Sequence, residues 1–175
     1  MALTLDAKQA MVAEVHAVAR EAHSVVAAEY RGLTVTQITG LRAKARESGV
    51  YLRVVKNTLA RRAVAGTQFE CIAGSLKGPL ILAFSTDDPG AAARVLKEFA
   101  KANEKLVPTL VSLGGQMLPG SDIEKVASLP TRDEALSMLL GVLKAPISKF
   151  VRTLAEPHAK LVRTVAAVKD QKAAA

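Results

Sequence analysis

The sequence predicts an α+β domain followed by one long C-terminal α-helix. Strand-like and helical patterns alternate up to about residue 130 and form two successive strand–helix–strand units. Beyond Pro130 no strand pattern follows, and apolar residues recur at helical spacing. A doubled unit of this kind is what a ferredoxin-like split βαβ fold requires: a four-stranded sheet with two crossover helices on one face, here with added helices. A small doubly wound parallel sheet shares much of the pattern and is the alternative. We therefore expect an α/β domain over residues 1–130 and a helix over residues 131–175.

The first half of the domain should contain a helix, a strand, a helix and a strand. Residues 6–22 carry apolar side chains at helical spacing, and residues 24–30 form a short β-rich run. Residues 34–48 suit a helix that begins at a threonine cap and stops before a glycine. Residues 50–55 alternate as a second strand. The buried face of the second helix is expected to contain Val35, Ile38, Leu41 and Ala45.

A short helix should follow the second strand and end near Gly66. Asn57 is a good N-cap, so the first turn should leave backbone N–H groups free to favour an anion, with Lys56 beside them. Cys71 lies in the irregular stretch after this helix, and we expect it to be a small buried apolar residue.

The second strand–helix–strand unit begins with residues 79–84, which are apolar on both faces. Asp88 is expected to cap the next helix, which ends near residue 103 and buries Ala92, Val95, Leu96 and Phe99. Residues 106–113 form a fourth strand, in which Pro108 favours an edge position. Glycine- and proline-rich turns and a short helix over residues 123–129 complete the domain.

The composition indicates a folded protein with a polyanionic partner. Hydrophobic residues make up 50% of the chain, and the formal net charge is +8. Cys71 is the only cysteine, so no internal disulfide can form and a reducing compartment is expected. Asp6 and Glu14 interrupt the N-terminal stretch where a signal peptide needs an apolar run, and no segment approaches the ~20 apolar residues of a membrane span. We expect a cytoplasmic protein.

The stretch from Tyr30 to Ala63 is strongly basic. It holds eight lysines and arginines, and Glu47 is its only acid. Because these charges alternate with apolar positions that suit packed elements, they predict a folded surface that binds a phosphate backbone. The alternative is a solvated helix face. Aromatic residues make up only 3% of the chain, which favours a structured RNA held through its phosphates and shape over single strands read by base stacking.

The tail repeats with a period of eleven residues. Segments 137–147, 148–158 and 159–169 align, and Pro146 recurs as Pro157. Eleven residues is close to three helical turns, so equivalent positions return to nearly the same face. The repetition predicts several copies of one partner, each bound to one apolar patch by helix-in-groove packing. The alternative is that the stripe packs back on the domain. The three patches consist of Leu139, Leu140 and Leu143; Phe150, Val151 and Leu154; and Leu161, Val162 and Val165.

Several motifs carry a resemblance to a known family. They are YRGLT from residue 30, SGVYLRVVKNTLARRA from residue 48, GTQFEC from residue 66, PGAAARVLKEFAKAN from residue 89 and KLVRTVAAVKD from residue 160. The chain resembles bacterial large-subunit ribosomal protein ten over essentially its whole length.

The resemblance implies the scaffold at the base of the ribosomal stalk. Such a protein binds large-subunit ribosomal RNA beside ribosomal protein eleven, and its C-terminal helix carries dimers of the acidic stalk protein seven/twelve, which recruit translational GTPases. The family's RNA-facing motif falls on Arg31, Gly32, Lys56, Asn57, Arg61 and Arg62, and the dimer sites fall on the three patches. Three dimers are expected here, although the first segment departs from the others at Gly141. With the neighbouring cations, the expected RNA-binding residues are Arg31, Gly32, Arg42, Arg46, Arg53, Lys56, Asn57, Arg61 and Arg62.

Three other functions are alternatives. No Walker-type loop, dinucleotide fingerprint or metal-spaced cluster supports an enzyme, and neither a cofactor nor a small-molecule substrate is expected. A basic amphipathic tail could lie on a membrane surface, but it has no Trp and only Phe150 as an aromatic. A general regulator that binds structured RNA is the third. Because relatives can repress translation of their own messenger, that role can also coexist with the structural one.

Overall fold

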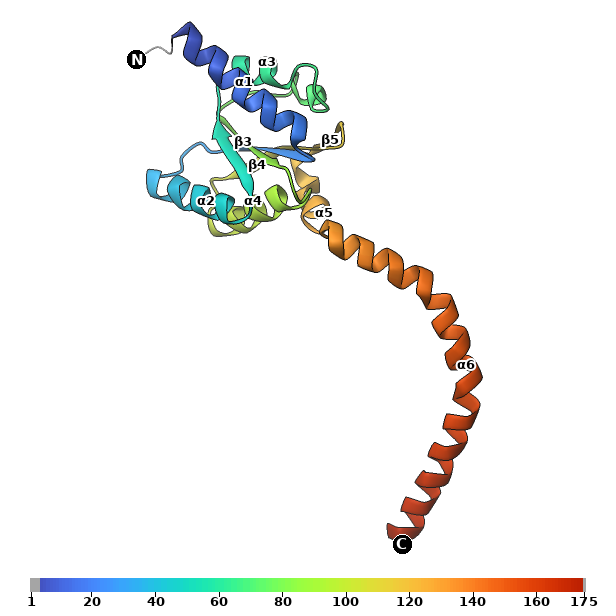
Figure 1. Cartoon of the computed structure of the whole chain (residues 1–175). Helices are drawn as coiled ribbons and strands as arrows, with labels where there is room; N and C mark the ends of the chain where they lie inside the picture. Colours follow the sequence, from blue (N-terminus) through green and yellow to red (C-terminus); the bar gives the residue numbers. More distant parts are fainter. Residues whose placement is uncertain (1–3, 175) are drawn as a thin grey trace. The chain divides into compact units, whose positions relative to one another are not determined.

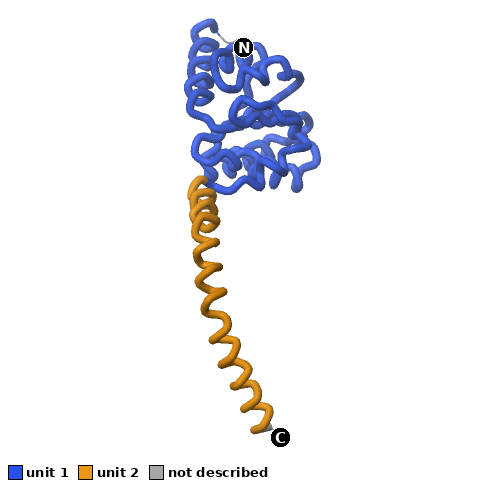
Figure 2. Tube along the Cα trace, turned by 90° about the vertical axis from the view of Figure 1, so that its right-hand side faces the viewer, with its two compact units in different colours: residues 1–131 blue, residues 132–175 orange. Residues whose placement is uncertain are grey.

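The computed structural model describes residues 4–174. It separates into two compact units, residues 1–131 and residues 132–175, shown in different colours in Figure 2. Each unit is described by itself below.

The first unit is built on a five-stranded sheet in the order β2–β3–β1–β4–β5, and all neighbouring strands are antiparallel. The order of the first four strands is that of the ferredoxin-like fold, which confirms that prediction and excludes the parallel-sheet alternative. The strands are β1 (Ser24–Glu29), β2 (Val50–Val54), β3 (Leu80–Ser85), β4 (Val107–Leu113) and β5 (Gln116–Pro119).

The strand β5 was not predicted. It forms a hairpin with β4 through Gly114 and Gly115, which have φ angles of +55° and +85°. Positive φ at both central residues is what a two-residue hairpin turn with the twist of the sheet requires. Because β5 pairs with Leu110–Leu113 of β4, the prediction that the fourth strand is an edge strand was wrong. Pro108 lies before the residues of β4 that pair with β5, and beside a register shift in the pairing with β1. At this point β5 requires no N–H donor from β4, so the proline is tolerated.

Both crossover helices lie on one face of the sheet, as predicted (Figure 1). They are α2 (Val35–Glu47) and α4 (Ala91–Ala102), and the short α5 (Ile123–Ala127) packs with α4. Leu41, Leu96 and Val111 are buried in the core of this face. The prediction that Val35 is buried was wrong, because its side chain is 82% exposed at the first turn of α2.

The helix starts differ in detail from the sequence prediction. Thr34 caps α2 in a capping box with Gln37, as its position suggested. The N-cap of α4 is Gly90 rather than Asp88. The Asp88 carboxylate accepts a hydrogen bond from the Gly90 N–H at 3.2 Å, so it stabilises the turn that precedes the helix.

The opposite face of the sheet is covered by α1 (Leu5–Glu21), α3 (Asn57–Val64) and the short 3-10 helix η1 (Glu70–Ile72). Its core contains Val15, Leu59, Phe69 and Phe84, with the two phenylalanine rings 6.4 Å apart in an edge-on arrangement. The prediction that Cys71 is buried was wrong. It is exposed because η1 places its neighbour Ile72 in the core and leaves Cys71 at the surface.

The second unit is a single helix, α6 (Arg132–Ala174), of 43 residues. Pro146 and Pro157 lie inside it, and the helix is curved along its length (Figure 1). Within residues 4–174, no helix has an apolar stretch long enough to cross a bilayer.

Candidate nucleic-acid interface and docking helix

The nine residues predicted to bind RNA are distributed over several neighbouring sites rather than one. Arg42 and Arg46 of α2 come together with Arg53 along the free edge of β2. With the rest of β2 they line a groove of about 420 Å³, here called the arginine groove. Among the described residues, β2 pairs only with β3, so its other edge is open there. This brings together three residues that lie on two different elements.

Arg53 is the one arginine of this groove that has an acidic partner among the described residues. Its guanidinium lies 2.7 Å from the carboxylate of Glu14 on α1, and the Tyr51 hydroxyl donates to the same oxygen at 2.7 Å. Burial first, and then the hydrogen bond to Glu14, raises the pKa of the Tyr51 hydroxyl above its ordinary value. No ion pair holds Arg42 or Arg46 in the part of the chain that the structure describes. The groove therefore presents two free guanidinium groups and one that is neutralised.

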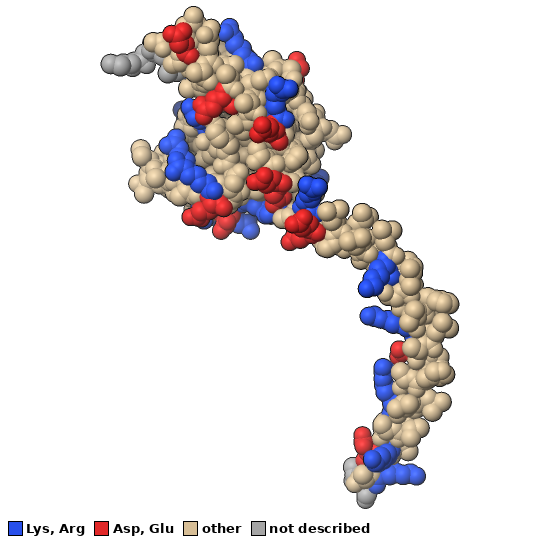
Figure 3. Space-filling view, in the orientation of Figure 1, with Lys and Arg blue, Asp and Glu red and all other residues tan. Residues whose placement is uncertain are grey.

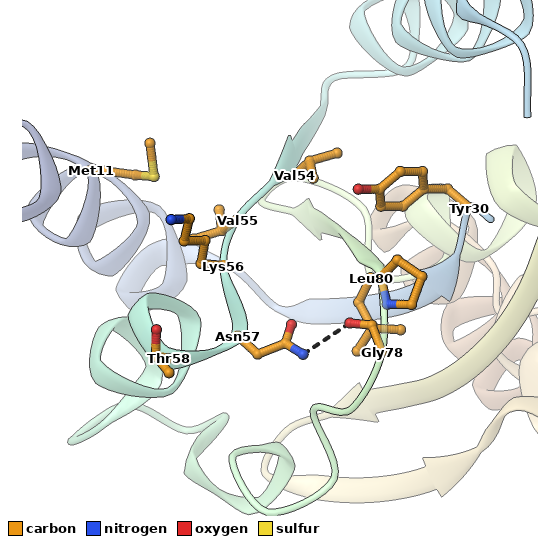
Figure 4. Close-up of a pocket in the computed structure, with 10 residues that line it drawn as sticks. Met11, Tyr30, Val54, Val55, Lys56, Asn57, Thr58, Gly78 and Leu80 are labelled. Carbon is orange, nitrogen blue, oxygen red and sulfur yellow. Dashed lines mark hydrogen bonds between the residues drawn. The ribbon is translucent and has the colours of Figure 1, made fainter. Parts of the chain in front are cut away.

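Lys56 and Asn57 lie at a second groove of about 440 Å³, at the end of the sheet (Figure 4). We call it the sheet-end groove; it is lined by Met11, Tyr30, Val54, Val55, Lys56, Asn57, Thr58, Gly78, Pro79 and Leu80. Asn57 was predicted to be the N-cap of the short helix, and this was wrong. The cap position of α3 is Lys56, and the Asn57 side chain instead donates to the Gly78 carbonyl at 2.9 Å. Asn57 therefore joins the start of α3 to the start of β3.

Arg31 and Gly32 form the turn that follows β1, and both are exposed. Gly32 has a φ of +86°, a conformation that favours glycine. A Cβ at this position would lie 3.4 Å from Cδ of Lys105, so this lysine stands beside the turn. Lys105 was not among the predicted residues, because it is distant in sequence from the basic stretch.

The two arginines of α3 differ in their surroundings. Arg61 donates to the Leu76 carbonyl at 2.9 Å, so part of its role is to hold the loop before β3. Arg62 is exposed and lines a shallow groove with Leu5, Lys8 and His16 of α1. The His16 ring donates to the Ala63 carbonyl at 2.8 Å, which accounts for this histidine without a metal. Among residues 4–174 no cluster of His, Cys, Asp or Glu side chains could hold a metal ion.

Sequence reasoning missed Tyr30, Thr58 and the Gly78–Pro79 pair as lining residues of the sheet-end groove. Tyr30 follows β1 and Gly78–Pro79 precede β3, so the segments meet only because the two strands are neighbours. The glycine and proline before the third strand were the one signal in the sequence that a turn lies there.

The nine apolar residues of the three tail patches are all exposed on α6, with exposed fractions of 56–68%. Figure 3 shows most of the lysines and arginines of this helix along its concave side, away from the convex side. Exposed large apolar side chains in such number are typical of an interaction site.

The first of the three segments has a second apolar surface. Met138 and Val142 are 58% and 69% exposed. The equivalent positions in the next two segments are Lys149 and Lys160, and Thr153 and Thr164. The three segments therefore share one apolar face, but only the last two have a polar face opposite it.

Comparisons with known proteins point to the same family in both the first unit and the C-terminal helix. The family model described as "Ribosomal protein L10" matches residues 3–101, and the model described as "Ribosomal protein uL10 C-terminal region" matches residues 129–155. The sequence is 68% identical over 175 residues to large ribosomal subunit protein uL10 of Methylococcus capsulatus, covering 100% of both chains. It is 64% identical over 174 residues to the uL10 protein of Thioalkalivibrio sulfidiphilus, covering 99% of both, and 63% identical over 175 residues to that of Alkalilimnicola ehrlichii, covering 100% of both.

Proposed function

Because this chain belongs to the uL10 family of large-ribosomal-subunit proteins, we propose that it joins ribosomal RNA to the acidic proteins of the ribosomal stalk. Members of this family are structural constituents of the ribosome and not enzymes. In the proposed arrangement, the first unit binds the large-subunit RNA at the stalk base beside ribosomal protein eleven. The helix α6 carries dimers of stalk protein seven/twelve, which recruit the translational GTPases.

The observation that supports RNA binding is the group of cations around β2. Arg42 and Arg46 have no acidic partner among the described residues, and Lys56 and Arg62 are likewise free of ion pairs there. Unpaired cations on neighbouring elements repel each other unless an anion lies between them. Phosphate groups of a folded RNA would supply such anions along an open strand edge.

The salt dependence of RNA binding tests this proposal. The full-length protein is titrated with the stalk-base segment of large-subunit ribosomal RNA from the same cells, at several salt concentrations. We expect affinity to fall steeply with salt. Each of the variants Arg42→Ala, Arg46→Ala, Lys56→Ala and Arg62→Ala should lower the slope of log K against log salt by roughly 1, because each removes one cation that neutralises a phosphate.

Lys125→Ala is the matched control for these variants. Its side chain is 80% exposed and forms an ion pair with Asp122 at 2.8 Å, and this lysine of α5 lines neither the arginine groove nor the sheet-end groove. It should leave the slope nearly unchanged. Equal slopes for all four variants and the wild-type protein would show that RNA does not bind this surface.

The observation that supports stalk docking is the threefold recurrence of one exposed apolar patch on α6. Packing a helix of a partner against each patch would remove three large apolar side chains per segment from water. A patch that recurs at every eleventh residue fits repeated copies of one partner. We propose three dimers, one per segment.

Native mass spectrometry of the full-length protein with the stalk protein of the same cells tests the number of dimers. We expect six stalk subunits, and four when residues from Lys160 onward are deleted. The double variant Val151→Asp/Leu154→Asp should also give four, because charged side chains in the middle patch cannot be buried without a large penalty.

Arg152→Ala controls for a general effect on α6, since this residue belongs to the middle segment but not to its apolar patch; six subunits should remain. Four subunits on the intact chain would limit docking to two segments. The absence of any stable complex would contradict the docking proposal, and binding to anionic vesicles would then favour a membrane-surface helix.

A further inference from the structure

We propose that the sheet-end groove holds one unstacked nucleotide of the RNA, with its base against the Tyr30 ring and its phosphate at Lys56. This inference rests on the proposed RNA-binding function and adds to it a specific contact with a base. It concerns a groove that the charge pattern alone does not identify, since most of its lining is apolar.

The groove has the two kinds of surface that a nucleotide needs. Tyr30, Val54, Pro79 and Leu80 provide apolar surface, and Lys56 with Thr58 provides a polar side. In Figure 4, Tyr30 lies on one side of the chain at the end of β2 and the Lys56 side chain on the other, toward Met11; the Asn57–Gly78 hydrogen bond lies below both in this view. The volume of about 440 Å³ is within the range of small-ligand sites.

The Tyr30 ring is held in place before any ligand arrives. Its backbone N–H donates to the Pro79 carbonyl at 3.3 Å, and its half-buried side chain packs against the core on the α2 side of the sheet. A fixed ring is a good stacking platform because little side-chain freedom is lost when a base packs on it.

The charges around the groove favour a nucleotide over an apolar peptide. Neither Lys56 nor Arg31, which follows Tyr30 directly, has an ion pair in residues 4–174. The Asn57 amide donates to the Gly78 carbonyl, and this hydrogen bond holds the side chain as part of the groove wall. Stacking with a cation at the phosphate would hold any base, and specificity would then come from an RNA fold that presents an unstacked nucleotide at this point.

Nuclear magnetic resonance of the ¹³C-tyrosine-labelled full-length protein tests the contact directly. The chain has only two tyrosines, Tyr30 and Tyr51, so the ring signals can be assigned with the Tyr51→Phe variant. On addition of the stalk-base RNA segment, a base stacked on the ring should shift the Tyr30 ring protons upfield. Tyr51, whose hydroxyl is bonded to Glu14, should show no such upfield shift.

Binding measurements on two variants provide the second test. Tyr30→Leu keeps an apolar side chain but removes the ring, and should weaken RNA binding about 5- to 150-fold, which corresponds to the roughly 1–3 kcal/mol of one base–aromatic stack. The salt slope should stay as in the wild-type protein, because the net charge is unchanged. Tyr30→Phe keeps the ring and should bind within about twofold of wild type, and thermal unfolding of both variants controls for a loss of folded protein.

The outcomes separate this inference from the proposed function. If the wild-type protein binds the RNA with a steep salt slope but Tyr30→Leu binds equally well and the Tyr30 signals do not move upfield, the nucleotide site is wrong and the RNA-binding function stands. If the wild-type protein shows no salt-dependent binding, the proposed function itself fails.

Discussion

Glu14 is the residue that sets how much positive charge the arginine groove presents. Its carboxylate accepts from both Arg53 and Tyr51, and the side chains of Glu14 and Arg53 are 43% and 38% exposed. At this exposure the ion pair adds little to stability, because water screens it. Its larger effect is on binding, since the same carboxylate competes with a phosphate for Arg53.

We therefore expect Glu14→Gln to strengthen binding of the stalk-base RNA and to steepen the salt slope by about 1, because Arg53 becomes free for a phosphate. The free energy of unfolding should change by less than about 1 kcal/mol. Titrations at several salt concentrations and chemical denaturation measure the two effects. Glu21→Gln on the same helix removes an equal charge without an ion pair in the described structure, and should give a smaller change. Equal effects of the two variants would show that only net charge matters.

At the scale of elements, the end of the β4–β5 hairpin depends on a glycine. A Cβ at Gly120, directly after β5, would overlap the Pro108 carbonyl oxygen of β4. Because this neighbour is backbone rather than a movable side chain, the chain itself would have to shift. Gly40, in the middle of α2, has open space instead: apart from its chain neighbours and the backbone of its own helix, no atom lies within 4 Å of an added Cβ.

These two glycines give opposite predictions for the same substitution. Gly120→Ala should lower the free energy of unfolding by about 1–3 kcal/mol or more, because the clash is with backbone. Gly40→Ala should raise it by about 0.5–1 kcal/mol, because alanine loses less conformational entropy in a helix. Chemical denaturation of both variants measures the difference. A neutral Gly120→Ala variant would mean that β5 and the following turn are not held against β4 as described.

The elements show which parts of the structure local patterns can predict. Helices and long strands were predicted because their periodicity lies within a few adjacent residues. The strand β5 was missed because it has only four residues, none of them buried, so it shows no alternation. Asn57 was predicted to cap α3 because asparagine is a favoured N-cap residue. Its amide instead donates to the Gly78 carbonyl, 21 residues away in sequence. The sheet-end groove likewise joins Tyr30 to Gly78–Pro79, which only the order of strands places together.

At the scale of the whole molecule, the two units are stabilised in different ways. The first unit has two apolar cores, one on each face of its sheet, whereas the large apolar side chains of α6 are exposed. Hydrophobic burial is the main stabilising term in folding, so the first unit should not depend on the second. In the same way, the α6 helix should gain most of its stability from bound partners.

Deletion of residues 132–175 tests this. We expect the midpoint of thermal unfolding of the remaining chain to stay within about 2 °C of the full-length value, since a shift of that size corresponds to well under 1 kcal/mol for a domain of this size. Binding of the stalk-base RNA should persist, and all binding of the stalk protein should disappear. Differential scanning calorimetry and native mass spectrometry give the two readouts. A large drop in the midpoint would show that α6 contributes to the folded core.

The two prolines inside α6 determine the curvature of the helix and therefore the directions in which bound partners would project from it. Each proline ring crowds the carbonyl four residues earlier, so the helix opens on the proline's side and bends away from it. Eleven residues separate Pro146 from Pro157, so both bends have nearly the same direction and add into one arc instead of cancelling. Successive patches are roughly 16 Å apart along the axis, which is short compared with the width of a small protein. In Figure 3 most of the cations of α6 follow the concave side, so partners bound on the opposite side would lie on the outside of the arc, where neighbouring copies diverge.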